Sequence, residues 1–580
     1  MRIGTSKIDI TFFREKLGML GYGRHFHYMH GIETPQYARA FAFEQHGRKM
    51  AFVNVDFCFT TIYLKNGIVE KLQLEYPELG YTDANLMITA QHTHSTAAGY
   101  TQHLIYNMVT PGFQWDVYEH YRDNIVKAIV EADLKLQEAE IRYHSGEFHP
   151  EAEVAFNRSV RSYNRNPEIE ERLGHKNRHL AVDRVMKLLR FNRPDGSPIG
   201  SVNWFGVHTT SVSNRYDKIC YDNKGYAADY FENYLKEEYC TDHEMHTAFA
   251  QDAAGDISPN YKWNMRTREY WGKYKDDYES AAYNGQLQFE KAKEIFEESM
   301  LQGEKIDGEI DYILAYFDMT NTEISEDYTK GISNQRTGPA CFGMAFLEGT
   351  TDGQGAPKAL GAIVKAFFNS SREVEILAAR LSKNPERQEE VLNFYNSQRP
   401  KAVVMNLSSG VVANARFPEK LVIPGFFDPV VKYIKHVHRV GKNVRTPWVE
   451  ERMPLQIFIL GKLAIVGIPS EITTVAGQRL RKTIAEVLKQ RGVETVILSP
   501  YANGYAGYIT TPEEYQLQRY EGGHTLFGRW TLPAYQIHFK ALATELLKST
   551  DERRYLGVEP MIFDKSEIWS GFEDPKVRIY

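Results

Sequence analysis

The chain has 580 residues, 42% of them hydrophobic and 25% charged, and a formal net charge of −6. This composition is that of a globular protein with enough apolar material for a large core. The lack of any strongly basic stretch argues against nucleic acid as a partner, and no run reaches the ~20 apolar residues of a transmembrane helix.

The N-terminal sequence MRIGTSKIDIT lacks the long apolar segment of a secretory signal peptide. We therefore expect a cytoplasmic location, or a secreted or periplasmic one if a signal has been removed. None of the four cysteines forms a CxxC pair, which argues against a zinc finger or a redox motif. Peripheral contact with a membrane and the oligomeric state are left open.

Strands and helices are predicted along the whole chain. Apolar, β-branched runs that end in polar loops are typical of buried strands. Their alternation with helical stretches indicates a mixed α/β (α+β) fold, with central β-sheets flanked by helices. The predicted strands are 49–59, 86–90, 199–207, 463–468 and 495–498, and the predicted helices include 117–136, 362–381 and 473–488.

A charged segment at about 262–308 is predicted to be a helical insertion. Phe289, Ala292, Ile295 and Phe296 fall on one face at helical spacing, and Met300 continues that face. This pattern favours a surface helix packed on the body of the protein. The alternative is a lid over a cleft, because the segment follows a motif-rich stretch of the chain.

Histidines close two of the predicted strands. His92 and His94 in AQHTHS follow strand 86–90, and residues two apart on an extended chain point to the same face. His208 in WFGVHTT closes strand 199–207 in the same way. Ligand sites in α/β sheets gather at the carboxyl ends of strands, so these imidazoles are candidate metal ligands or substrate contacts. The alternative is a set of histidines hydrogen-bonded in loops or in the core.

Two further segments are ambiguous from the residues alone. Glu471 in GIPSEITT lies between a strand and a helix, where the helix dipole alone would favour an acidic cap. Tyr508 lies in the glycine-punctuated loop YANGYAGYITT. Tyrosine is a rare metal ligand because its ordinary pKa is about 10, although a bound cation favours the phenolate.

The segment GDISPN at 255–260 predicts a tight turn. Ser258 within it is a candidate nucleophile, but no GxSxG elbow surrounds it. A serine in such a loop is usually only a turn residue.

Taken in order along the chain, these segments resemble the neutral/alkaline (non-lysosomal) ceramidase family. The resemblance extends from GMLGY at 18–22 to TLFGRWTL at 525–532 and covers almost the whole chain. The shared segments between them are HTHS at His92, NRS at Asn157, VHTTS at 207–211, GDISPN at Gly255, GTTDGQG at Gly349, GIPSEITTVAGQRLR at Gly467 and GYITTPEEYQLQRYEG at Gly507.

The resemblance implies a single ceramidase-like catalytic domain over 1–580 that holds one zinc ion per chain. The family commonly ends in a C-terminal β-sandwich, but only 46 residues follow Ala534, fewer than the ~100 of such a domain. We therefore expect a short C-terminal extension in its place. The implied zinc ligands are His92, His208, Glu471 and Tyr508, and the implied catalytic or substrate-contacting residues are His94, Arg158, Tyr520, Ser258 and Asp256.

Two mechanisms compete within this resemblance. In one, zinc activates a water molecule that attacks the amide carbonyl; in the other, Ser258 attacks and an acyl-enzyme forms. We favour the first because Ser258 has no evident base beside it in the sequence. His94 would then act as general acid or base, and Arg158 or Tyr520 would stabilise the oxyanion.

The sequence departs from the family pattern near the site. After HTHS it has Thr96-Ala97-Ala98-Gly99 in place of Gly-Pro-Gly-Gly, and Ala253 stands where the family usually has Asn. We expect hydrolysis of the N-acyl amide bond of ceramide or a ceramide-like lipid to a fatty acid and an amine, a step in sphingolipid metabolism. The alternatives are the same chemistry on a smaller or more polar amide or ester, and a non-catalytic lipid-binding relative.

Overall fold

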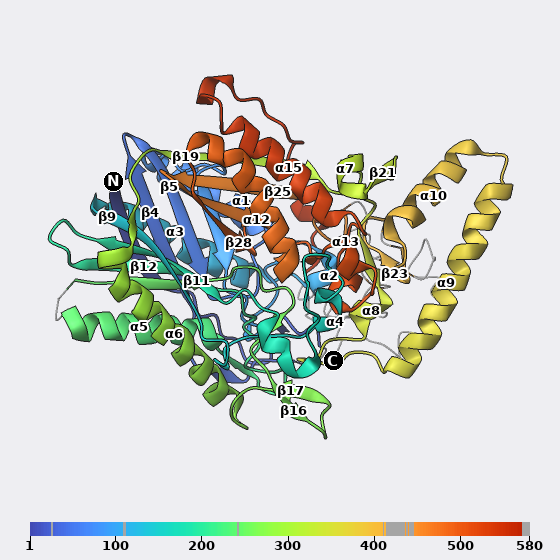
Figure 1. The fold of residues 1–580 in the computed structure, drawn as a ribbon, viewed down its shortest axis with the longest axis horizontal. Coiled ribbons are helices and arrows are strands. Elements are labelled where there is room, and N and C mark those ends of the chain that lie inside the picture. The colour runs from blue at the N-terminus through green and yellow to red at the C-terminus, as the bar shows by residue number, and fades with distance from the viewer. Residues whose placement is uncertain are drawn as a thin grey trace.

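The computed structural model describes residues 1–24, 27–107, 112–239, 243–409, 411–412, 436, 439 and 446–570. Three large mixed sheets form its centre (Figure 1). The first has the order β6 (Leu86–Ala90), β5 (Arg48–Val55), β4 (Tyr37–Gln45), β1 (Arg2–Asp9), β8 (Gln137–Glu138). The second has the order β14 (His246–Ala250), β12 (Pro198–Trp204), β11 (Val185–Asn192), β9 (Glu140–Glu147), β18 (Glu304–Lys305). The third has the order β19 (Ile310–Asp318), β25 (Arg452–Leu460), β26 (Leu463–Ile468), β28 (Thr495–Pro500).

Each large sheet contains one parallel pair: β5 with β6, β12 with β14, and β26 with β28. Parallel neighbours require a crossover connection, and a helix supplies it in each case. These helices are α1 (Ile62–Glu75), α5 (Asp222–Tyr239) and α12 (Thr474–Leu488). The segments that leave β6, β12, β26 and β28 carry the predicted metal ligands.

The inner faces of the three sheets share one apolar core. The Phe52 and Trp204 rings, from the first and second sheets, lie 5.5 Å apart between centroids. The Trp204 indole N–H donates to Ser499 Oγ of the third sheet at 3.3 Å, which satisfies a polar group in an otherwise apolar layer. The sheets are therefore held to one another by side chains rather than by shared strands.

Helices cover the outer face of each sheet. Helix α1 and α3 (Trp115–Leu134) pack on the first, α5 and α6 (Asp277–Gln302) on the second, and α12 and α15 (Thr531–Glu545) on the third. Sheets covered on both sides need strands that are apolar throughout. This explains why β6 and β26 consist almost entirely of apolar residues that are all buried, and the two strands confirm the predicted fold class and the strands 86–90 and 463–468.

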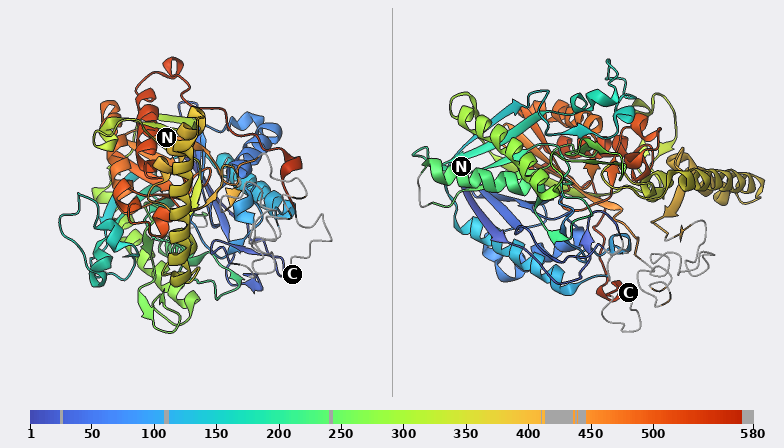
Figure 2. Two further views of the ribbon diagram at one scale, coloured as in Figure 1. Left: turned by 90° about the vertical axis from the view of Figure 1, so that its right-hand side faces the viewer. Right: turned by 90° about the horizontal axis from the view of Figure 1, so that it is seen from below.

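The other predicted elements are confirmed with shifted ends. The strand predicted at 49–59 is β5 and ends at Val55, and the strand predicted at 199–207 is β12 and ends at Trp204. The predicted helices correspond to α3, α12 and α9 (Lys358–Leu381). Helix α9 and its neighbour α10 (Pro385–Gln398) project from one end of the molecule (Figure 2).

The segment 262–308 is helical only over α6. In that helix Ala292, Ile295 and Phe296 are fully buried against α5 and the second sheet. The residues before it form the hairpin β16 (Lys262–Asn264) and β17 (Glu269–Trp271). This hairpin contacts the loop 349–355, where Tyr270 N–H donates to Thr351 O at 2.9 Å.

In the part of the chain that the structure describes, no helix is both long enough and apolar enough to cross a bilayer. Helix α15 extends past Ala534 to Glu545, and short 3-10 turns follow at Thr550–Glu552 and Lys565–Glu567. Residues 571–580 of the predicted C-terminal extension lie outside the described residues.

Candidate metal centre

His92 is held in an unusual backbone conformation at the end of β6. Its φ is +80°, in the left-handed region that costs a non-glycine residue roughly 1–3 kcal/mol. Two contacts fix it there: its backbone N–H donates to Phe57 O at 3.0 Å, and its ring Nδ1 lies 2.6 Å from Cys58 O. Because a carbonyl only accepts, Nδ1 carries the proton and Nε2 presents a lone pair.

His208, beyond the end of β12, is oriented by the same device. Its Nδ1 lies 2.7 Å from Ala254 O and 3.0 Å from Ile257 O, so Nδ1 carries a proton and the lone pair of the neutral ring is on Nε2. Backbone carbonyls that fix the tautomer in this way are common partners of metal-binding histidines.

Glu471 and Tyr508 are brought together by a short parallel ladder. Although they are 37 residues apart in the sequence, β27 (Glu471–Ile472) pairs with β29 (Tyr508–Ile509), and Glu471 is directly opposite Tyr508. The crossover through α12 accounts for this spacing. It places a carboxylate and a phenol on the same side as the two histidines.

The four predicted ligands converge. Glu471 Oε2 lies 3.0 Å from His208 Nε2 and 3.6 Å from His92 Nε2, and the Tyr508 hydroxyl lies 3.4 Å from His208 Nε2. Ligands about 2.0–2.1 Å from a tetrahedral zinc are about 3.3 Å from one another. The donor types and their mutual distances therefore fit a zinc ion.

Burial alone would raise the pKa of the Glu471 carboxyl, but His92, His208 and the Tyr505 hydroxyl hold it well below its usual range. Tyr505 donates to Oε1, and Tyr501 donates to Oε2 at 3.2 Å. Burial lowers the pKa of His92 to about 4, so that imidazole is neutral at pH 7, which is its metal-binding form. Glu471 thus supplies the fixed negative charge of the cluster.

Cys58 lies beside the cluster but does not join the donor set. Its Sγ is 3.8 Å from His92 Nδ1, the nitrogen that already donates to Cys58 O. Burial and the Glu471 charge raise the pKa of the Cys58 thiol well above its usual value. A protonated thiol on the protonated side of His92 is a poor metal ligand.

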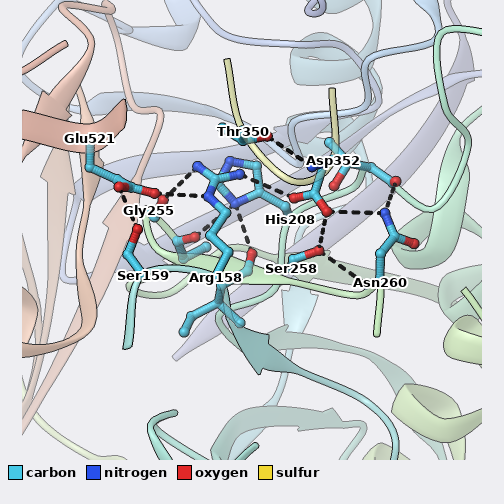
Figure 3. Close-up of polar contacts among 12 residues, drawn as sticks. Arg158, Ser159, His208, Gly255, Ser258, Asn260, Thr350, Asp352 and Glu521 are labelled. Carbon is cyan, nitrogen blue, oxygen red and sulfur yellow. Dashed lines mark hydrogen bonds and ion pairs between the residues drawn. The ribbon is translucent and has the colours of Figure 1, made fainter. Parts of the chain in front are cut away.

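Arg158 lies among the loops beside the metal cluster, with Gly255, Asp352 and Glu521 around its side chain (Figure 3). Its Nη2 donates to the Tyr508 hydroxyl and to Gly255 O, each at 2.9 Å. Its charge is balanced by Glu521, 2.9 Å from Nε, and by Asp352, 3.4 Å from Nη1. The guanidinium is buried and lies 5.4 Å from the centroid of the Tyr520 ring. Tyr520 is therefore on the same side of the cluster as Arg158.

His94 faces the same space as the ligands. Its Nε2 is 3.1 Å from His92 Nε2, and its Nδ1 has no hydrogen-bond partner among the described residues. Burial, and then the neighbouring His92 and His208, lower its pKa well below the usual value. Tyr22 packs edge-on against the ring at 4.7 Å, and Gly21 is required behind it, because a Cβ there would lie 2.5 Å from His94 Cγ.

Ser258 and Asp256 lie behind the cluster rather than among its donors. The Ser258 hydroxyl donates to Asp352 Oδ1 at 2.7 Å and accepts the Asn260 N–H at 3.0 Å. Asp256 Oδ1 accepts the backbone N–H and the hydroxyl of Thr474 at the start of α12, both at 2.8 Å. Its Oδ2 accepts from Asn157 at 2.6 Å, and its backbone carbonyl accepts the Arg158 N–H at 2.8 Å.

Several functional contacts were not predicted. Tyr501 and Tyr505 belong to the same loop as Tyr508, the only tyrosine there that was predicted to be a metal ligand. The close spacing of the three tyrosines was the one sequence feature that could have indicated the other two. Asp352 lies within GTTDGQG, and Glu521 within GYITTPEEYQLQRYEG, two segments that carry the family resemblance. The carbonyls of Cys58 and Ala254 have no side-chain signature in the sequence.

The two departures from the family pattern have structural roles. Thr96 and Ala97 form β7, which pairs with β2 (Met19–Leu20) and so connects the histidine loop to the N-terminal segment. Ala253 is buried where space is short: a Cβ added to Gly477 would lie 2.7 Å from the Ala253 Cβ.

Several known proteins are similar to this chain in sequence and in fold. The family model described as neutral/alkaline non-lysosomal ceramidase, N-terminal, matches residues 1–423 and 432–537. Neutral ceramidase B of Dictyostelium discoideum is 31% identical over 575 residues, covering 95% of this chain and 73% of that protein. The neutral ceramidase of Pseudomonas aeruginosa is 30% identical over 549 residues, covering 94% and 72%.

Solved structures agree. The crystal structure of the Pseudomonas aeruginosa neutral ceramidase matches with a TM-score of 0.73 at 29% identity, covering 97% of this chain and 76% of that one. A ceramidase complexed with C2 matches with a TM-score of 0.77 at 29% identity, covering 97% and 77%. The family match and the shared fold define an amide-bond hydrolase. The chain belongs to the neutral/alkaline non-lysosomal ceramidase family.

Replacing Tyr505 with Phe should weaken zinc binding by roughly 10–100-fold, because Glu471 Oε1 loses the hydroxyl that orients it. The ring itself stays stacked on Phe59, 4.2 Å away. Zinc affinity measured by competition with a chelator tests this. Tyr555→Phe, at an exposed tyrosine, is the matched control; equal affinities in all three proteins would contradict the assignment.

Replacing Asp352 with Asn should lower kcat/KM by roughly 10–100-fold, as expected when a substrate-orienting group moves. The amide no longer balances Arg158 and accepts more weakly from Ser258. Zinc content should be unchanged, since Asp352 touches no predicted ligand. Asp551→Asn, on an exposed turn, controls for general loss of charge. Parallel loss of zinc and activity would show that Asp352 supports the metal site instead.

Proposed function

We propose that this chain is a zinc-dependent hydrolase that cleaves the N-acyl amide bond of ceramide or a ceramide-like lipid to a fatty acid and an amine. The observation that carries the proposal is the convergence of His92, His208, Glu471 and Tyr508 from separate strand ends. The relatives named as neutral ceramidases support ceramide as the substrate.

One zinc ion would be held by the two Nε2 atoms, the Glu471 carboxylate and the Tyr508 oxygen. Zinc in such a site supplies Lewis acidity and lowers the pKa of a water molecule. Arg158 assists the binding of the Tyr508 oxygen, because its guanidinium donates to that atom and favours the phenolate. Burial and then the Glu471 charge nevertheless hold the pKa of the Tyr508 phenol well above its usual value, so Arg158 opposes that rise without cancelling it.

His94 is the group we assign to proton transfer. Its neutral imidazole faces the donor cluster through Nε2, and it is not one of the four ligands. In this role Nε2 takes the proton of the attacking water and returns it to the departing amine nitrogen. Gly21 and Tyr22 hold the ring in place from the opposite side.

Arg158 and Tyr520 are the groups we assign to the developing oxyanion. Both lie on the Tyr508 side of the cluster, and Arg158 is a permanently charged donor. Glu521 and Asp352 fix the orientation of the guanidinium, so the donor is preorganised before the substrate enters.

Ser258 and Asp256 fit positioning roles better than covalent ones. The Ser258 hydroxyl donates to a carboxylate, Asp352, and no histidine is a hydrogen-bond partner of it among the described residues. Asp256 anchors the start of α12 and the backbone of Arg158. Water is therefore the nucleophile we favour.

Purified protein should contain close to one zinc per chain, and His92→Ala should lose both the metal and the release of fatty acid from ceramide. His149→Ala, at an exposed histidine, should retain both. Metal analysis and an acyl-release assay on long-chain ceramide and on a short, water-soluble N-acyl amide measure this. Zinc-free, active wild-type protein would refute the proposal; hydrolysis of the soluble amide alone would change the substrate but not the chemistry.

Ser258→Ala separates the two nucleophiles. If water attacks, the variant keeps its zinc and most of its kcat, and intact-protein mass spectrometry finds no acyl adduct during turnover. If Ser258 attacks, kcat falls by a factor of the order of a million, as for loss of a serine nucleophile, and wild-type protein trapped in the steady state carries the acyl group.

A further inference from the structure

Helix α9 presents a long apolar face to solvent. Its large exposed side chains lie between 51% and 76% exposed, whereas single exposed apolar residues elsewhere are scattered. The exposed alanines at positions 359, 362, 366 and 378 extend the same face. At about 100° per residue, the large side chains fall within roughly 100° of the helix circumference. They are Leu360, Ile363, Phe367, Val374, Leu377 and Leu381.

The opposite side of α9 is already packed. Ile376 and Ala379 are buried there, and the Tyr395 hydroxyl of α10 donates to Glu375. Near the start of the helix, Lys365 forms an ion pair with Glu348 at 2.6 Å. These contacts fix the rotation of α9 about its own axis. Because the opposite side of α9 is packed against its neighbours, the apolar face points to solvent along the whole helix, which is about 36 Å long.

The charges of α9 favour a negatively charged partner. Both acidic side chains of the helix are engaged: Glu375 accepts from Tyr395, and Glu373 pairs with Arg372 and Arg399. Lys358 and Arg380, and Lys383 just beyond the helix, are exposed and form no ion pair with the described residues. The exposed acidic side chain of α9, Glu373, is thus neutralised by arginines, and the other exposed acidic side chains of α9 and α10 are Glu386, Glu389 and Glu390 on α10.

The helix is also close in sequence to the site. Asp352, which contacts Arg158 and Ser258, is six residues before the first residue of α9. The preceding turn, α8 (Met344–Leu347), packs Phe346 against Tyr520, with 5.2 Å between ring centroids. A surface that engages α9 would therefore be connected to the substrate side of the cluster through one short loop.

We propose that the outward face of α9 docks the enzyme on a lipid bilayer that contains anionic lipids. A helix with a wide apolar face and unpaired basic residues at its ends is the type that lies in the plane of a membrane surface, with its apolar side chains inserted below the headgroups. Docking in this way would keep the enzyme where its lipid substrate resides. The proposal rests on the proposed function for its physiological meaning, but vesicle binding can be measured without catalysis.

The test is co-sedimentation of the full chain with vesicles of phosphatidylcholine alone and of phosphatidylcholine with phosphatidylglycerol. Wild-type protein should bind the anionic vesicles. The double variant Phe367→Glu, Leu377→Glu should bind them at least about tenfold more weakly, because two inserted side chains are lost. Lys358→Gln with Lys383→Gln should weaken binding to the anionic vesicles and leave the salt dependence shallower.

Leu301→Glu is the matched control, because Leu301 is a single exposed leucine at the end of α6; it should bind as the wild type does. Wild-type protein that sediments with neither vesicle, or a Phe367→Glu, Leu377→Glu variant that binds normally, would overturn the proposal. So would light scattering that finds a wild-type dimer converted to a monomer by the double variant, since the face would then bind a second copy.

Hydrolysis of a short, water-soluble N-acyl amide separates this proposal from the proposed function. The α9 variants should retain their zinc and cleave the soluble substrate at the wild-type rate, while losing activity on ceramide presented in anionic vesicles. Vesicle binding by a wild-type protein that cleaves neither substrate would leave the docking surface supported and the proposed function refuted.

Discussion

The carboxylate of Glu471 is buried where three sheets meet, and the surrounding structure offsets the cost of that charge. A buried, unpaired carboxylate would be strongly destabilising. Here two tyrosine hydroxyls donate to its oxygens, and two imidazole nitrogens lie 3.0 Å and 3.6 Å from Oε2. Because both imidazoles use Nδ1 to donate to backbone carbonyls, the atoms they turn toward Glu471 are lone pairs. Lone pairs and a carboxylate repel one another unless positive charge lies among them, and either a proton on an imidazole or a divalent cation would supply it.

This arrangement requires all three sheets. His92 follows a strand of the first sheet, His208 follows a strand of the second, and Glu471 and Tyr508 follow the parallel pair of the third. The positions of the three sheets relative to one another are fixed by a shared apolar core rather than by shared strands. Arg158 and Asp352 come from loops outside the sheets and extend the site toward α9. Loops therefore connect the predicted metal ligands to helix α9. The ligands themselves follow the ends of strands in the sheets.

Features that depend on a local sequence pattern were predicted, whereas contacts between residues far apart in the sequence were not. Strand-end placement found His92, His94 and His208, because a buried strand is a local pattern of apolar residues. Glu471 has an equally good local explanation as a helix cap, and Tyr508 lies in a loop, so only the family resemblance selected them. Asp352 was missed because its partners, Ser258 and Arg158, are 94 and 194 residues away. The helix at α9 was predicted, but the exposure of its apolar side chains was not, since a helical stretch of sequence looks the same whether a neighbour covers it or not.

The predicted metal ligands follow strands of three separate sheets, so the complete ligand cluster exists only when the tertiary structure is assembled. No single sheet holds more than two of them, so an ion with high affinity for the site would bind only after every sheet had formed and packed. By linkage, such an ion would add its binding free energy to the stability of the whole chain rather than to one segment. Loss of any one sheet would release it, and the enzyme would pass directly from a metal-loaded state to one with no assembled site.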